Sequence, residues 1–468
     1  MTFAPDRDRL FPVDPATRSR ARDLHASVAD LPIISPHGHV DPRILVEDRA
    51  FDNAADLLIR DDHYVTRLMH SAGIGLERLG VSPHDGMAAR PREVWRTFSE
   101  NWDLYTGTAS GYWLRSILAE QFGLSEHPSS ANADAVFDEI GARLAEPSFR
   151  PRALFRTYGI ELLATTDDPM DDLAPHAMLA ADPAFGGRVV PTFRPDAYLA
   201  PTSPGWAQRV SRLSEWNGTR DTDYAGYLSA LEGRRAYFIQ HGAVSADHGV
   251  AQPRAIELDA SDAARLFEKA HAGTITTDEA SVFSAHMLFE MARMSTRDGL
   301  VMTVHPGVFR NHDHETFTRF GPDSGHDIPV ATEYVNALRP LLNRFGNTPD
   351  FHLVLFSVDE TTYSREIAPL AGYYPAVFIG APWWFLDAPD AGLRFRAAVT
   401  ETAGFSRGSG FIDDTRAFMS IPVRHDMSRR LDAAFLARLV GEGRIDQPQA
   451  ERTIVDLVDA QPRRVFKL

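Results

Sequence analysis

The sequence predicts an α/β protein built on a closed, TIM-like (β/α)8 barrel. Eight short apolar runs recur along the chain, and helical patterns separate most of them. Histidines, acids and arginines follow many of these runs, and (β/α)8 enzymes carry their chemistry at the carboxyl ends of their strands. A doubly wound open sheet is the alternative, but no GxGxxG fingerprint follows an early run. The expected strands cover residues 31–34, 160–165, 188–193, 236–241, 300–305, 351–357, 376–380 and 410–412.

Composition limits the class of protein to which these strands belong. The chain has 468 residues, 44% of them hydrophobic, and a formal charge of −16 that disfavours nucleic acid and anionic membranes as partners. It has no cysteine, which excludes disulfides, thiolate metal sites and thiol nucleophiles. The N-terminus has no signal-peptide core, and no run approaches the roughly 18 apolar residues of a membrane span. We therefore expect a cytoplasmic protein.

The first helix and the first strand lead to a pair of histidines. Residues 14–29 predict a helix with Asp14 as its N-cap and Pro15 at its first position. The strand in LPIISPHGHVD ends in His37 and His39, and residues two apart in a strand point to the same side. Both imidazoles can therefore converge on one ion, although two polar rim residues are the alternative. Gly38 between them lets a ligand or another backbone approach closely.

A long helical block follows this strand. Four segments between residues 42 and 158 show apolar residues at i, i+3 and i+4, which is too much helix for a simple crossover. We assign the block as a helical insertion beside the main domain. The predicted divisions are 1–41 for the N-terminal helix and first strand, 42–158 for the insertion, 159–430 for the rest of the barrel and 431–468 for C-terminal helices packed on it.

Polar side chains follow every expected strand, which is hard to explain by packing alone. Besides the two histidines, they are Thr165 to Asp168, Arg194, Asp196, His241, Ser245, Asp247, His248, His305, Arg310, Asp359, Glu360, Trp383, Trp384, Asp413, Asp414 and Arg416.

Several candidates also have a purely structural interpretation. Asp414 can be the N-cap of a helix TRAFMSI, and Asp247 can cap a turn. His63 and Tyr64 can form a buried, hydrogen-bonded pair within a helix. The other structural interpretations are core packing for Trp383 and Trp384, and surface or structural ion pairs for Arg67 and Arg424.

Seven motifs together resemble the uronate isomerase (glucuronate isomerase) family, a branch of the amidohydrolase superfamily. They are SPHGHVDP, DDHYVTRLM, VPTFRPD, SADHG, VHPGVFRN, PWWF and DDTRAFMSIPVRHD, and the match runs in order from about Asp8 to the C-terminus. The resemblance implies a distorted (β/α)8 barrel with a helical insertion after its first strand. It also implies hexuronate catabolism, by interconversion of D-glucuronate with D-fructuronate and of D-galacturonate with D-tagaturonate.

The residues suit this chemistry. Turning an aldose into a ketose moves a proton from C2 to C1 through a cis-enediol, which requires a base, a proton carrier and cationic donors. The C6 carboxylate of a uronate is best held by a guanidinium group. Arg194, Arg310 and Arg416 are available for these tasks.

The resemblance also implies individual roles. His37, His39 and Asp414 would bind one divalent ion, expected to be zinc, with His305 as a possible further ligand. Tyr64, Asp414 and Arg416 would be catalytic, with Tyr64 as a proton carrier whose pKa is lowered by Arg416 or the metal, and Asp414 as the rival base. The expected substrate-binding residues are His63, Arg194, Asp247, His305, Arg310, Trp383 and Trp384.

Two departures disfavour a two-metal hydrolase. The expected fourth strand, AYFIQHG, has no lysine to bridge two metals, although His241 could serve as a ligand, and FHLVLFSVDE ends in no histidine. A mononuclear metal-dependent amidohydrolase or lactonase is the alternative function, and a non-catalytic sugar-acid binding protein is the third. We expect the protein to form a homo-oligomer.

Overall fold

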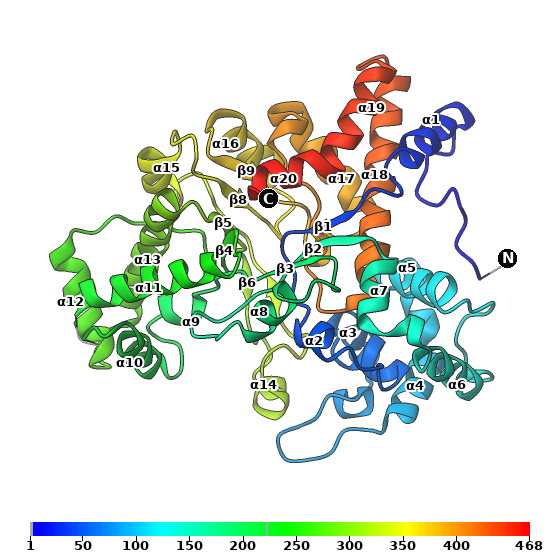
Figure 1. Cartoon of the computed structure of the whole chain (residues 1–468), viewed down its shortest axis with the longest axis horizontal. Helices are drawn as coiled ribbons and strands as arrows, with labels where there is room; N and C mark the ends of the chain where they lie inside the picture. Colours follow the sequence, from blue (N-terminus) through cyan, green and yellow to red (C-terminus); the bar gives the residue numbers. More distant parts are fainter. Residues whose placement is uncertain (1–2, 221–222) are drawn as a thin grey trace.

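Short parallel strands lie at the centre of the molecule, and helices surround them (Figure 1). The computed structural model describes residues 3–220 and 223–468. One parallel sheet has the order β1-β2-β3 and the other the order β4-β5-β8-β9, and a single bridge between Phe193 and Ala246 joins them. The predicted α/β class is confirmed. The strands are β1 (Ile33–Ser35), β2 (Ile160–Ala164), β3 (Arg188–Val190), β4 (Ser245–His248), β5 (Val301–Val304), β8 (Leu353–Leu355) and β9 (Val377–Ile379).

The fourth expected strand was wrong. Most of residues 236–241 lie at the end of helix α11 (Tyr224–Gln240), and the strand is β4, which begins at Ser245. The buried residues of α11 include Tyr227, Leu231 and Phe238, whose spacing is helical. A short apolar run such as AYFI fits a strand and a buried helix equally well.

The eighth expected strand is also not found. Residues 410–412 form no strand, and the nearest pairing is one bridge between Gly408 and Ile379. Gly410 has φ +81°, a left-handed conformation that breaks an extended chain. Toward β1, this part of the chain makes a backbone hydrogen bond of 2.9 Å from His39 N to Thr415 O.

Helices fill the chain between β1 and β2, and their buried side chains, such as Trp95, Phe98 and Leu118, share one hydrophobic cluster with residues of β1, β2, β3 and the long helix α18 (Ile421–Gly441). The helices between β1 and β2 gather at the lower right of Figure 1. These helices are α2 (Arg43–Glu47), α3 (His63–Ser71), α4 (Pro91–Glu100), α5 (Ala109–Ser116), α6 (Ala133–Leu144) and α7 (Pro151–Thr157).

The N-terminal helix α1 (Pro15–Ala26) begins as predicted, because Asp14 accepts a hydrogen bond from Thr17 N and Pro15 follows it. It packs on α18, with Leu24 and Leu436 in a shared cluster. The main hydrophobic core lies around β4, β5 and β8 and the helices beside them.

The remaining helices are α8 (Ala174–Ala180), α9 (Asp196–Leu199), α10 (Trp206–Asn217), α12 (Ala260–His271), α13 (Thr277–Asp298), α14 (His314–Phe320), α15 (Arg339–Phe345), α16 (Ala368–Tyr373), α17 (Pro389–Ala403), α19 (Gln447–Val455) and α20 (Gln461–Phe466). A short antiparallel ribbon joins β6 (Val308–Phe309) to β7 (Ile328–Pro329). Within residues 3–220 and 223–468, we find no helix both long and apolar enough to cross a bilayer.

Candidate active site

A cavity of about 460 Å³ lies where the parallel strands end. Its size is typical of pockets that enclose a small molecule. His37 follows β1, Asp247 lies in β4, His305 follows β5 and Trp383 follows β9, so strand ends far apart in the sequence meet here. This cavity is lined by every residue to which the sequence analysis gave a metal-binding, catalytic or substrate-binding role: His37, His39, His63, Tyr64, Arg194, Asp247, His305, Arg310, Trp383, Trp384, Asp414 and Arg416.

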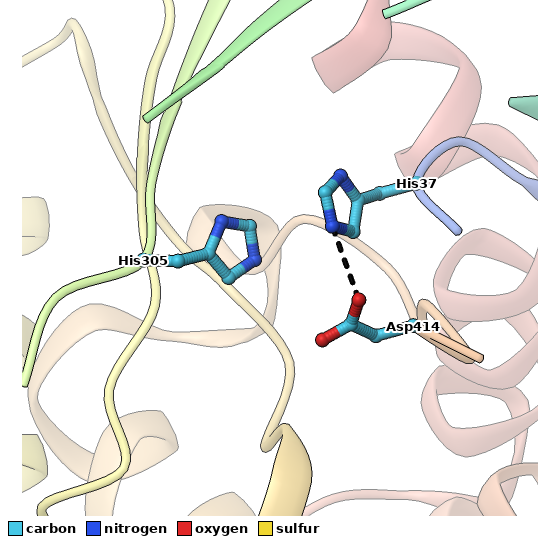
Figure 2. Close-up of side chains that lie close together, drawn as sticks. All are labelled: His37, His305 and Asp414. Atoms are coloured by element: carbon cyan, nitrogen blue, oxygen red, sulfur yellow. Dashed lines mark ion pairs between the residues drawn. The ribbon is translucent and has the colours of Figure 1, made fainter. Parts of the chain in front are cut away.

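Three potential metal ligands converge at the base of this cavity. One ligand atom each from His37, His305 and Asp414 lies within 4.8 Å of the others (Figure 2). The Nε2 atoms of His37 and His39 lie 3.1 and 2.9 Å from Asp414 Oδ1. Among the described residues, nothing donates a well-oriented hydrogen bond to Asp414 Oδ1, and the buried Nε2 of His305 is also unpaired. Imidazole nitrogens and a carboxylate that converge without such hydrogen bonds fit a divalent cation.

Asp247 holds His305 in place. Its Oδ1 lies 2.6 Å from both His305 Nδ1 and Thr303 Oγ1, and it has no exposed surface. The contact with Nδ1 leaves Nε2 of the same ring facing the convergence point. Burial alone would raise the pKa of Asp247, but the charges of His305, His37 and Arg194 outweigh it and hold the pKa well below its usual range. Asp247 lies within β4, so the interpretation of this residue as a turn cap is wrong.

Arg194 is held between two acids. Its Nε donates to Asp196 Oδ2 at 2.8 Å, and its NH1 lies 3.4 Å from Asp247 Oδ2. Burial opposes the charge, but Asp196 and Asp247 raise the pKa of the guanidinium, so Arg194 is a permanent cation at the cavity. Gly249 makes room for this pair, since a Cβ there would lie 2.6 Å from Arg194 NH2 and 2.8 Å from Asp196 Oδ2.

Two further arginines are more exposed. Arg310 donates from NH1 to Asp327 Oδ2 at 2.7 Å, and its guanidinium lies 5.5 Å from the centre of the Trp384 ring. Within the part of the chain that the structure describes, the one ion pair of Arg416 is a distant contact of 4.0 Å with Asp323 Oδ2, and 40% of the Arg416 side chain is exposed. Arg416 therefore retains the most capacity to pair with an anion in the cavity.

His63 and Tyr64 begin helix α3, where Asp62 is the N-cap. Their rings stack at 4.7 Å, and Trp384 Nε1 donates to His63 Nε2 at 3.1 Å. Burial and the charge of Arg416 lower the pKa of His63 to about 4, so this imidazole is neutral at pH 7. His63 and Tyr64 therefore stack on each other, and His63 accepts a hydrogen bond from Trp384.

The expectation that Arg416 lowers the pKa of Tyr64 was wrong. Burial raises the pKa of this phenol well above its ordinary value of 10, and Arg424 opposes the effect without overcoming it. Arg424, and not Arg416, is therefore the cation that acts on Tyr64. Tyr64 stays protonated at neutral pH in this structure.

Trp383 and Trp384 belong both to the hydrophobic core and to the cavity wall. Both are buried in a core cluster with Phe356, and both line the cavity. The edge of Trp383 packs on His305 with ring centres 4.8 Å apart. Trp384 donates its hydrogen bond to His63, so Trp383 contacts His305 and Trp384 contacts His63.

Residues with a left-handed backbone conformation are concentrated around the cavity. Eight non-glycine residues in the described chain have positive φ, and four of them, Asn311, Asp323, Trp384 and Asp414, line the cavity. Asp414 has φ +43°, and the next helical turns begin only at Phe418 and Ile421. The interpretation of Asp414 as a helix N-cap is therefore wrong.

Comparison with known proteins identifies the family. Residues 15–466 match the family model described as glucuronate isomerase. A uronate isomerase of Corynebacterium efficiens is 54% identical over 98% of this chain and 98% of its own. This chain belongs to the glucuronate isomerase (uronate isomerase) family.

Solved structures agree with this assignment. The crystal structure of glucuronate isomerase from Caulobacter crescentus has a TM-score of 0.97 and 47% identity, over 100% of this chain and 98% of that chain. The uronate isomerase of Thermotoga maritima has a TM-score of 0.92 and 28% identity, over 98% and 99% of the two chains. The resemblance drawn from the seven motifs is thus confirmed.

Some residues at the site of this family member escaped the sequence analysis, and some candidates lie elsewhere. Asp62, Gly249, Asp323 and Asp327 line the cavity or support its arginines, and none of them was among the candidate residues. Two lay within quoted motifs, Asp62 in DDHYVTRLM and Gly249 in SADHG.

Several candidate residues lie outside the cavity. His241 is the C-cap of α11, and its Nδ1 lies 2.8 Å from Tyr237 O. The other candidates outside the lining are Thr165 to Asp168, Ser245, His248, Asp359, Glu360 and Asp413.

Proposed function

We propose that this protein is a uronate isomerase, which interconverts D-glucuronate with D-fructuronate and D-galacturonate with D-tagaturonate. The observation that carries the proposal is one cavity lined by both the converging His37, His305 and Asp414 and the three arginines. A cyclic amide or lactone needs no partner for a carboxylate, whereas a hexuronate does. The mononuclear hydrolase is therefore not favoured.

We infer that Asp414 and His37, with His39 and His305, bind one divalent ion, expected to be zinc. Such an ion supplies positive charge that anchors and polarises substrate oxygens. The inference is supported by the convergence of two imidazole Nε2 atoms on Asp414 Oδ1 and by the buried Nε2 of His305, which has no hydrogen-bond partner among the described residues. Asp247 fixes the His305 ring through Nδ1, so that Nε2 is presented to the ion.

The arginines and Tyr64 supply the remaining chemistry in this proposal. Arg416, which has the weakest ion pair of the three arginines, pairs with an anionic group of the substrate, and Arg194 and Arg310 supply further positive charge. Asp414 is ionised, because His37 and His39 outweigh its burial and lower its pKa, so it takes the proton from C2 and returns it to C1 of the cis-enediol. Tyr64, protonated at neutral pH, donates its proton to O1 as the enediol forms and regains one from O2 as the ketone forms.

The direct test is turnover of glucuronate. Purified protein is incubated with glucuronate and ketose formation is followed, with p-nitrophenyl esters and lactones as hydrolase controls. We expect ketose formation without hydrolysis of the controls. Hydrolysis without ketose formation would support the mononuclear hydrolase instead.

The metal is tested by a double variant, His37→Ala with His39→Ala. We expect it to lose the bound ion, because it removes two of the imidazoles that meet Asp414. Metal content per chain is measured by mass spectrometry. His241→Ala is the control, since that residue ends α11 outside the cavity, and it should keep the ion. A stoichiometric ion in the double variant would contradict this site.

We further infer that the two sheets form a distorted (β/α)8 barrel, with residues 42–158 as a helical insertion and the other divisions at 1–41, 159–430 and 431–468. The bridges from Phe193 to Ala246 and from Ile379 to Gly408 support a ring of strands. A cytoplasmic homo-oligomer without nucleic-acid or membrane partners stays a prediction, and sedimentation of the purified protein tests the assembly.

A further inference from the structure

We propose that Arg424, a buried residue behind the cavity wall, is a positioning residue that fixes the Asp414 carboxylate and the Tyr64 ring relative to each other. The inference rests on the proposed function. From the sequence, Arg424 is expected to form a surface or structural ion pair. The structure places it between the two groups that the proposed reaction uses for proton transfer.

Arg424 lies in the first turn of α18 and is 1% exposed. Its NH1 donates to Asp387 Oδ2 and to the backbone carbonyl of Asp413, each at 3.0 Å. Its guanidinium carbon lies 3.8 Å from the centre of the Trp113 ring and 5.4 Å from that of Tyr64. One side chain therefore joins three segments: the helices between β1 and β2, the turn after β9, and the loop that carries Asp414.

The hydrogen bond to the Asp413 carbonyl bears directly on Asp414. Rotation about φ of Asp414 swings that carbonyl relative to the Asp414 side chain, so holding the carbonyl holds φ. The observed φ of +43° is unfavourable for a residue with a Cβ and must be imposed by the surroundings. His425 Nε2 lies 3.1 Å from Asp413 Oδ2, and His39 N donates to Thr415 O on the other side. Arg424 is thus the restraint on the peptide group immediately before Asp414.

Arg424 contacts Tyr64 through the face of its aromatic ring and not through a hydrogen bond. Trp113 packs edge-on to Tyr64 with ring centres 5.7 Å apart, and the guanidinium group lies near both rings. A buried cation beside an aromatic face is attracted to it, which favours one placement of the ring. Arg424 does not line the cavity, so it acts on the substrate only through Tyr64 and Asp414.

A purely stabilising role is the competing explanation, and the chain offers a matched control. Arg235 is also fully buried and pairs with Asp298 through two hydrogen bonds, of 2.5 and 3.0 Å, between α11 and α13. It does not line the cavity. Arg235→Met and Arg424→Met therefore remove the same buried guanidinium from an ion pair with an aspartate, at different distances from Asp414 and Tyr64.

The experiment compares Arg424→Met, Arg235→Met and wild type. For Arg424→Met we expect kcat on glucuronate to fall about 100-fold with KM within about threefold, the size of a general acid–base contribution. We expect its zinc dissociation constant, measured by competition with a chelator, to rise about fivefold or more. Arg235→Met should lower the melting temperature but leave kcat and zinc affinity within about threefold. Equal effects of the two variants on kcat and on zinc affinity would overturn the inference.

A second variant keeps the test decisive if Arg424→Met does not fold. Arg424→Lys keeps the charge but loses the planar group, and it should lower kcat about tenfold or more at unchanged KM. A kcat within threefold of wild type in that variant would overturn the inference. Wild-type protein that forms no ketose would contradict the proposed function alone, because zinc affinity would still measure the effect of Arg424 on Asp414.

Discussion

At the scale of single residues, Gly249 controls the placement of Arg194. Gly249→Ala introduces a Cβ that would overlap Arg194 NH2 and Asp196 Oδ2, so the guanidinium must move. We expect KM for glucuronate to rise about tenfold, the equivalent of about 1.4 kcal/mol. The control is Gly141→Ala in α6, where nothing lies within 4 Å of the added methyl group. Unchanged steady-state kinetics in Gly249→Ala would argue against a role for Arg194 in binding.

Tyr64 is the second residue with a direct consequence for activity. Tyr64→Phe removes the protonated hydroxyl and should lower kcat by about 10² or more, while metal content stays unchanged. Tyr105→Phe is the control, since its hydroxyl donates to Val65 O on the same helix α3 without lining the cavity. It should lower stability by about 1 kcal/mol and keep kcat. A near-normal kcat in Tyr64→Phe would assign the proton transfer to Asp414 alone.

At the scale of elements, the ribbon of β6 and β7 brings Arg310 to the cavity. Asp327, just before β7, is 5% exposed and accepts from Arg310 NH1 and Asn311 N, both at 2.7 Å. Asp327→Asn removes the charge that holds Arg310, so we expect KM to rise about fivefold to tenfold with little change in kcat. These values correspond to about 1 to 1.4 kcal/mol.

The control for that element is Asp313→Asn in the same segment. Asp313 is the N-cap of α14, and asparagine caps a helix as well as aspartate does. Its kinetics should match wild type. If both variants raise KM equally, the segment as a whole and not the Arg310 contact is responsible.

At the scale of the whole molecule, Asp167 makes stability depend on pH. Burial raises its pKa to about 7, although Thr165 and Thr192 donate hydrogen bonds to it. Between about pH 4 and pH 7 the unfolded chain has released this proton while the folded chain retains it. Wild-type stability is therefore lost as pH rises through that range, by about 4 kcal/mol at most.

Asp167→Asn removes this titration and tests it. We expect the melting temperature of the variant, relative to wild type, to rise between pH 5 and pH 8, because only wild type then carries a buried negative charge. Calorimetry at several pH values measures the difference. A difference that stays constant with pH would show that Asp167 ionises normally in the folded protein.

Local patterns in the sequence were enough to predict much of the site. His37 and His39 share a side because a strand alternates its side chains, and α1 begins at Pro15 because its cap is local. Because the carboxyl ends of barrel strands meet on one face, the positions of Arg194, His305 and Arg310 after expected strands predicted that they share a site. The fourth strand was misplaced because an apolar run of four or five residues has no periodicity of its own.

By itself, the sequence determined the family, the α/β class and the identity of the cavity-lining candidates, because these depend on residue type, order and local period. Only the tertiary structure decided how they act. The raised pKa of Tyr64 and the burial of Arg424 against Tyr64 and Trp113 arise from packing between segments hundreds of residues apart, and the left-handed φ of Asp414 occurs where such segments meet. Burial and electrostatic interaction depend on distances in space, which a local pattern does not encode.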